Sequence, residues 1–201
     1  FVFIAMLCTI MRAVSYPLLS DVCKDSNYCQ MCTDTVIKCE GSESRRGLLE
    51  DIPINDVSVN ITALNLGYNM LKEILIGTPN RTTYGLFTNY PNLKCLNLVG
   101  NRIQRFKDSF IGLPSLQEVN LSENPIETDS SKASLDGIFE QFLDIRILNV
   151  SRLNARQKTM TIDPLILALD SLRNSNIEIL DFSEIQKDRR SSLNISQLLQ
   201  L

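Results

Sequence analysis

Apolar residues and one asparagine recur with fixed spacing in the middle of the chain. The segment from residue 92 to residue 126 contains one unit written twice, with a period of 23 residues. Five positions of the first copy have counterparts in the second: Leu93, Leu96, Leu98, Asn101 and Ile103 correspond to Leu116, Val119, Leu121, Asn124 and Ile126. Because several spaced positions match at once, the pattern predicts a solenoid of stacked units.

The spacing L-x-x-L-x-L-x-x-N-x-L is that of a leucine-rich repeat. Further copies begin at Ile61, Ile145 and Ile177, so the chain holds about five repeats at intervals of 32, 23, 29 and 32 residues. We therefore predict an α/β leucine-rich repeat solenoid, curved, with short parallel strands on its concave face. The predicted repeat core is Leu64, Leu66, Asn69, Leu93, Leu96, Leu98, Asn101, Leu116, Val119, Leu121, Asn124, Leu148, Val150, Leu180 and Phe182.

The residues between the spaced leucines should face solvent on the concave sheet, because side chains alternate along a strand. These positions are Ala63, Asn65, Gly67, Tyr68, Cys95, Asn97, Val99, Gly100, Glu118, Asn120, Ser122, Glu123, Ile147, Asn149, Ser151, Arg152, Ile179, Asp181, Ser183 and Glu184. The repeat asparagine should bond backbone groups in the turn that leaves each strand. Leu153 and Ile185 replace it in the last two repeats, which predicts looser turns there.

The return segments of the repeats carry a second periodic feature. Aromatic and apolar residues lie six and three positions before successive repeats: Phe87, Phe110 and Phe139, and Tyr90, Leu113 and Phe142. They should stack from coil to coil as an apolar spine on the convex side. Before the last repeat the spine is interrupted, and Leu165, Leu169 and Leu172 suggest a short helix instead. The long intervals are expected to add loops and no further strands.

Three regions divide the chain. Residues 1–15 hold an apolar run and small residues at positions 13 and 15, which is typical of a secretory signal peptide. No Met stands at position 1, so we expect that the true start is missing. Residues 16–50 should form a cysteine-rich N-terminal cap with a strand at 35–39, and residues 51–201 the repeats, truncated at the C-terminus.

Four cysteines follow the predicted signal peptide closely: Cys23, Cys29, Cys32 and Cys39. Their spacing is compatible with zinc ligands, and Cys29 and Cys32 with a redox pair, but both need a reducing compartment. A small cap with little core of its own needs crosslinks, so two disulfides are favoured, and four cysteines allow three pairings. Cys95 is left over, at a solvent-facing strand position.

Five N-x-S/T sequons are candidate glycosylation sites in a secreted chain. They begin at Asn60, Asn80, Asn120, Asn149 and Asn194. Asn120 and Asn149 fall on the concave sheet, where a glycan would cover part of a binding face.

Charge and composition exclude several functions. The formal net charge is −3 with no basic cluster, so nucleic acid is not an expected partner. There is no histidine, the commonest general base and metal ligand, and no recognisable catalytic constellation. We expect no enzyme activity, cofactor or metal.

The signal, the cysteine cap, the entry V-N-I-T-A-L-N-L at 59–66 and the phenylalanine-bearing repeats together resemble Toll-like receptor ectodomains. Resemblance to N-terminal repeat caps implies the pairs Cys23–Cys32 and Cys29–Cys39. The family resemblance implies an innate immune pattern-recognition receptor that binds a microbial or protein ligand and dimerises. It would lie on the extracellular side of the plasma membrane or in the endosomal lumen, held by a membrane helix outside this chain. The alternative is a secreted or matrix-associated repeat protein that acts in binding or adhesion.

Overall fold

The structure is a computed structural model of the 201-residue chain. It describes residues 29–33, 35–41, 60–72, 75–76, 84–85, 87, 90–104, 110, 113–126, 139–142, 144–153, 168–169, 172 and 175–184. The predicted signal peptide, residues 1–15, lies outside these ranges.

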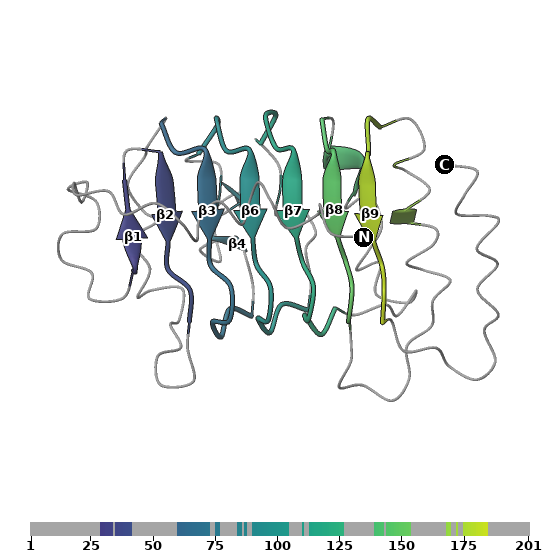
Figure 1. Ribbon diagram of the computed structural model, residues 1–201, viewed down its shortest axis with the longest axis horizontal. Coiled ribbons are helices and arrows are strands. Elements are labelled where there is room, and N and C mark those ends of the chain that lie inside the picture. The colour runs from purple at the N-terminus through teal and green to yellow at the C-terminus, as the bar shows by residue number, and fades with distance from the viewer. Residues whose placement is uncertain are drawn as a thin grey trace.

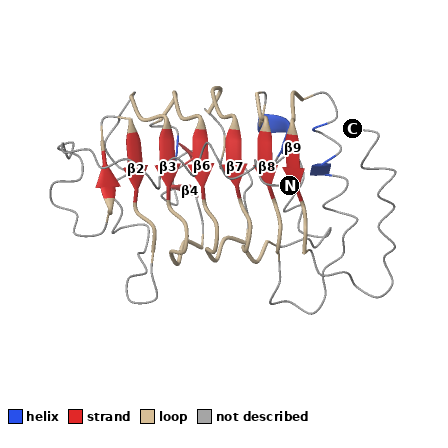
Figure 2. Cartoon of the chain, viewed as in Figure 1, coloured by secondary structure: helices blue, strands red, loops and turns tan. Residues whose placement is uncertain are grey.

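Seven short strands form one sheet that runs the length of the described chain (Figure 1). In spatial order they are β1 (Met31–Cys32), β2 (Val36–Lys38), β3 (Ala63–Asn65), β6 (Cys95–Asn97), β7 (Glu118–Asn120), β8 (Ile147–Asn149) and β9 (Ile179–Asp181). Within this sheet β2, β3, β6, β7, β8 and β9 pair in parallel, and β1 pairs with β2 in antiparallel fashion. Figure 2 shows how little helix accompanies this sheet in the described part of the chain. The predicted solenoid of parallel strands is confirmed.

The strand register follows the sequence repeat. The central residue of each strand pairs with the central residue of the next coil, as Leu64 does with Leu96 and Leu96 with Val119. These side chains are buried, whereas the first residue of each strand keeps some exposure, because successive side chains point to opposite faces. The core thus lies behind the sheet. At the far end, Leu180 and Phe182 pack on this core but are only partly buried.

The repeat asparagines form a ladder of side-chain to backbone bonds. Nδ2 of Asn101 donates to the carbonyls of Leu66 and Leu98, each at 2.9 Å. Asn69 and Asn124 make the corresponding pair of bonds in their own coils. Each amide therefore joins the turn of its own coil to that of the preceding one. The role predicted for these residues is confirmed.

The turn at Leu153 is not looser, so the prediction for that coil is wrong. Leu153 is fully buried, and the preceding residue Arg152 has φ 53°, close to the values in the other coils. The backbone N–H of Arg152 donates to the carbonyl of Ser183 in the next coil at 3.0 Å. Inter-coil backbone bonds hold the turn without the asparagine. Ile185 lies outside the described residues.

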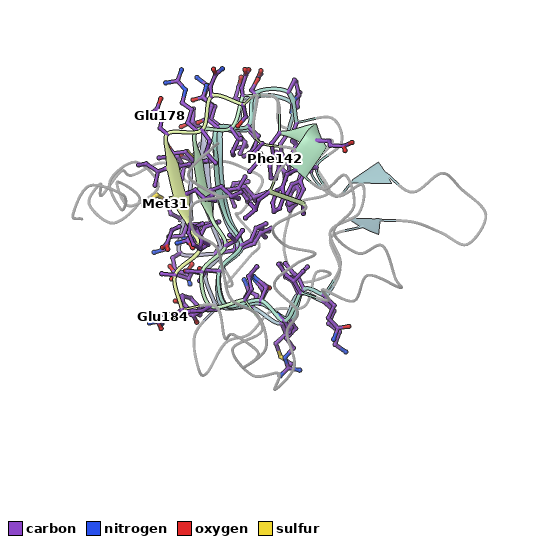
Figure 3. All side chains as sticks on the ribbon, turned by 90° about the vertical axis from the view of Figure 1, so that its right-hand side faces the viewer. Met31, Phe142, Glu178 and Glu184 are labelled. Carbon is purple, nitrogen blue, oxygen red and sulfur yellow. A yellow bond between two sulfur atoms is a disulfide. The ribbon has the colours of Figure 1, made fainter. Side chains whose placement is uncertain are left out.

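The convex side contains the predicted spine. Phe87, Phe110 and Phe139 are buried, and so are the three residues at the companion positions. Ring contacts cross between the two rows: Phe110 lies 4.8 Å from Phe142, and Phe139 lies 5.8 Å from Phe142, centroid to centroid. Phe139 begins the 3-10 helix η6 (Phe139–Gln141). In Figure 3, Phe142 lies on the interior side of the sheet.

Two further features lie on the return segments. Strands β4 (Leu75–Ile76) and β5 (Tyr84–Gly85) pair in antiparallel fashion as a second, two-stranded sheet. In Figure 3 they project from the side opposite the main sheet. Because these strands lie in a long interval, the expectation that long intervals add only loops is wrong. Residues 168–169 are helical, and Leu169 and Leu172 are buried as expected; Leu165 lies outside the described residues.

The cap continues the solenoid and is tied by a disulfide between Cys29 and Cys39. Backbone bonds extend the inter-coil ladder into the cap, from Cys39 N to the carbonyl of Asn65 and from Gly41 N to the carbonyl of Gly67. Cys39 is fully buried, so it closes the end of the core. This is one of the two pairs that the resemblance implied. The other, Cys23–Cys32, lies outside what the structure describes.

Candidate binding groove

A groove of about 400 Å³ crosses the concave face where the strands end. Its lining comes from the cap and from five successive coils. The lining residues are Lys38, Glu40, Asn65, Tyr68, Asn97, Val99, Asn120, Ser122, Glu123, Asn149, Ser151, Arg152, Asp181, Ser183 and Glu184. We call this site the strand-end groove. All except Lys38 and Glu40 are residues that the sequence pattern placed on the concave face.

A row of four amides and one carboxylate forms the floor of the groove. The last residues of β3, β6, β7, β8 and β9 are in register: Asn65, Asn97, Asn120, Asn149 and Asp181. In each coil, Oδ1 of this residue accepts the backbone N–H two positions later, at 2.9 to 3.1 Å. This local bond caps the turn that leaves the strand. These residues therefore stabilise the turns and also line the groove.

The rim of the groove is set by a backbone turn in the left-handed region. The same repeat position has positive φ in all five coils: Tyr68 (56°), Gly100 (68°), Glu123 (59°), Arg152 (53°) and Glu184 (54°). Glycine suits this conformation best, and other residues adopt it only where neighbouring structure holds them. Here bonds between coils do so, such as Glu123 N to the carbonyl of Ser151 at 3.1 Å. The turn places four large side chains along the rim, with Gly100 between the first and the second.

Tyr68 marks the end of the rim beside the cap. It is 43% exposed, the largest exposure of a bulky apolar residue in the described chain. Its ring lies on Gly100, where an added Cβ would approach Cδ1 of Tyr68 to 2.4 Å. Gly41 packs against the backbone of Tyr68 from the other side. Gly100 thus leaves room for the aromatic ring, and Gly41 leaves room for the backbone of the same residue.

Three charged side chains link the last coils. Nε and Nη2 of Arg152 donate to Glu184 at 2.8 and 2.9 Å. Nη1 of the same guanidinium donates to Glu123 at 3.2 Å. The hydrogen bond from Arg152 is the main reason that the pKa of Glu184 is lowered below its ordinary value of 4.5. The hydrogen bond to Glu184, followed by that to Glu123, raises the pKa of Arg152. This network spans the coils of β7, β8 and β9.

We expect Glu184→Gln to remove a pH-dependent contribution to stability. Because the folded-state pKa of Glu184 is lowered, its contribution is present above the unfolded-state pKa and is lost as pH falls through the folded-state value. The urea midpoints of wild type and variant should differ slightly at pH 7. They should converge when the pH is below 4.5, the ordinary pKa of this carboxyl group. Glu140→Gln, an exposed change on η6, serves as the control. A difference that stays constant from pH 7 to pH 3 would contradict this origin.

The groove carries more acid than base. Lys38, Arg152, Glu40, Glu123, Asp181 and Glu184 are its charged residues, so two basic groups face four acidic ones. Both basic groups are already paired: Nζ of Lys38 lies 2.9 Å from Glu40, and Arg152 is held as described. Sequence reasoning missed Lys38 and Glu40. Their register with Asn65 and Gly67 was hidden because the cap does not match the repeat pattern.

The other candidate residues are distributed as follows. Asn60 is exposed, whereas Asn120 and Asn149 line the groove and each accept a bond from the serine of their own sequon, Ser122 and Ser151. Asn80 and Asn194 lie outside the described residues. Cys95 is a free, half-buried thiol that is in register with Ala63 and Glu118.

The described ranges contain neither a cluster suited to a metal ion nor a candidate membrane span. Within them, no group of three or more Cys, Asp or Glu side chains is placed to hold a metal ion. Nor does any helix among these residues combine the length and the apolar character needed to cross a membrane.

A comparison with protein families agrees with this topology over part of the chain. Residues 82–126 match a family model described as "Leucine rich repeat". No curated protein sequence matches. A chain in the crystal structure of the Drosophila melanogaster SNF/U2A' complex is 15% identical, with 83% of this chain and 87% of that chain covered and a TM-score of 0.43. The chain thus has the fold of a leucine-rich repeat solenoid, and residues 82–126 match the family model.

Proposed function

We propose that the strand-end groove binds a ligand without catalysis, within the extracellular part of an innate immune pattern-recognition receptor resembling Toll-like receptors. The observation that carries the proposal is the groove itself, to which the cap and five coils each contribute side chains. Leucine-rich repeats are scaffolds that present extended concave binding surfaces, generally to protein partners. Ligand binding would act by bringing two receptor chains together.

The Cys29–Cys39 disulfide supports placement in an oxidising compartment. The protein would then lie on the extracellular side of the plasma membrane or in the endosomal lumen. In this proposal residues 1–15 are the signal peptide, residues 16–50 the cap and residues 51–201 the repeats. Attachment to the membrane would use a helix that follows these repeats in the full-length receptor.

A secreted or matrix-associated binding or adhesion protein accounts equally well for the groove and the cap. The full-length coding sequence separates the two. A membrane-spanning helix followed by a signalling domain supports the receptor, whereas a second cysteine cap followed by a stop codon overturns it in favour of the secreted protein.

The binding role is tested by placing a photo-crosslinking amino acid at Asn97 in the groove floor. The matched control places it at Glu140, which is exposed on η6. The full-length protein is displayed on cells and irradiated in the presence of extracellular material. Adducts from Asn97 and not from Glu140 support the proposal. Equal yields at the two sites, or no adduct from Asn97, argue against recognition in the groove.

A further inference from the structure

We propose that the strand-end groove takes a neutral, hydroxyl-rich ligand, an oligosaccharide. This rests on the proposed function, since it names the ligand class of the same site. Three properties of the groove carry the inference: the orientation of its amides, the placement of its carboxylates, and the kinds of contact that its lining does not offer.

The amides in the groove floor present donors. Their orientation is fixed, because the backbone N–H groups of Gly67, Val99, Ser122 and Ser151 can only donate and therefore require the amide oxygen. Each Nδ2 group is thus directed away from the turn. Within the described part of the chain these nitrogens have no hydrogen-bond partner. In this row Asn97, Asn120 and Asn149 are half-buried, whereas Asn65 is 5% exposed.

The spacing of this donor row suits a polymer of sugar rings. Neighbouring strands of a sheet lie about 4.8 Å apart. That distance is close to the advance per residue of an extended hexose chain, so successive rings can meet successive donors. The groove volume of about 400 Å³ falls within the range of roughly 300–1,000 Å³ that is usual for ligand sites.

Acceptors stand at the end of the row. Asp181 continues the asparagine column on β9, with Oδ1 bonded to the N–H of Ser183 at 3.0 Å. Its other oxygen remains available; Glu184 lies on the rim of the same coil, and Glu123 lies on the rim two coils away. A hydroxyl can accept from an amide nitrogen and donate to a carboxylate at the same time. Sugar hydroxyls can therefore use both kinds of group.

Other ligand classes fit this lining poorly. An anionic ligand would meet four acidic groups, while Lys38 and Arg152 are already paired with carboxylates. An apolar ligand, or the apolar centre of an ordinary protein interface, would find only Val99 and Tyr68 among the described lining residues. The neutral, polar ligand is the one whose chemistry the groove matches.

Asn97→Asp tests the proposal with little structural disturbance. The aspartate keeps the oxygen that accepts the N–H of Val99 at 3.1 Å, but it replaces the Nδ2 donors by a second acceptor. Asn97 is not part of a sequon, so the change leaves glycosylation untouched. Gln117→Glu is the matched control, since it makes the same amide-to-acid change just before β7, outside the groove.

The probe is an array of neutral, sialylated and sulfated oligosaccharides, applied to the full-length protein with its folded state checked by urea unfolding. We expect selective binding to neutral oligosaccharides. Asn97→Asp should weaken this binding about tenfold or more, as the loss of a buried hydrogen bond implies, and Gln117→Glu should leave it unchanged.

The proposal is overturned if no neutral oligosaccharide binds, if acidic ones are preferred, or if the two variants behave alike. Glycans mapped at Asn120 or Asn149 of binding-competent protein would also overturn it. If the array fails while Asn97 still crosslinks to a protein, recognition in the groove stands and only the ligand class is wrong.

Discussion

Asn101→Ala should lower the free energy of unfolding by about 3–5 kcal/mol, because three buried hydrogen bonds are lost together. Nδ2 of Asn101 donates to the carbonyls of Leu66 and Leu98. Its Oδ1 accepts the N–H of Leu71 at 3.2 Å. The asparagine is itself 5% exposed, so water cannot easily replace these bonds. Only the N–H of Leu71 is left without a partner, at roughly 1–3 kcal/mol. The carbonyls of Leu66 and Leu98 each keep one donor, from Asn69 and Asn124, so each bond lost to them costs about 1 kcal/mol.

Urea unfolding followed by circular dichroism measures this loss. Asn97→Ala is the control within the same coil, because Asn97 makes a single bond to the N–H of Val99 and is only half-buried. It should cost about 1 kcal/mol, as one ordinary hydrogen bond does. Similar losses for the two alanine variants would show that the ladder has no special role in holding the coils together.

Much of the fold could be predicted from the sequence, because a solenoid repeats one local rule. The spacing of Leu93, Leu96 and Leu98 fixes a strand and its buried side, and the same spacing in neighbouring coils fixes the register. The asparagine at the end of the pattern, Asn101, has one physical role wherever it occurs. Such features depend on neighbours that the sequence period itself identifies.

Features that depend on contacts between unlike residues could not be predicted in this way. The Glu123, Arg152 and Glu184 network requires the left-handed turn, and nothing in the side-chain types reveals that three coils share it. The β4–β5 hairpin lies in a stretch without repeat pattern, so its pairing had no periodic signal. The turn before Leu153 is held by inter-coil backbone bonds, which the type of the side chain does not reveal.

The candidate groove could be predicted from the sequence only in part. Its floor was identifiable, since the residues that face the concave side follow from strand alternation. The direction of the amides was not, because it depends on whether Oδ1 or Nδ2 of Asn97 meets the N–H of Val99. The repeat therefore predicts where a ligand can lie, and the turn geometry indicates which chemical groups it meets. A donor row with acidic neighbours emerges only when both are known.

Phe110→Ala should cost about 3–5 kcal/mol, comparable to the ladder variant but through packing. Phe110 is 1% exposed and its ring lies 4.8 Å from that of Phe142, so truncation leaves a cavity between two coils that the backbone bonds keep in place. The measurement is the urea midpoint at constant m-value. Phe110→Leu fills more of the same space and should lose clearly less, which separates a cavity from a general intolerance of change at this position. If alanine and leucine cost the same, the aromatic contact and not the filled volume holds these coils together.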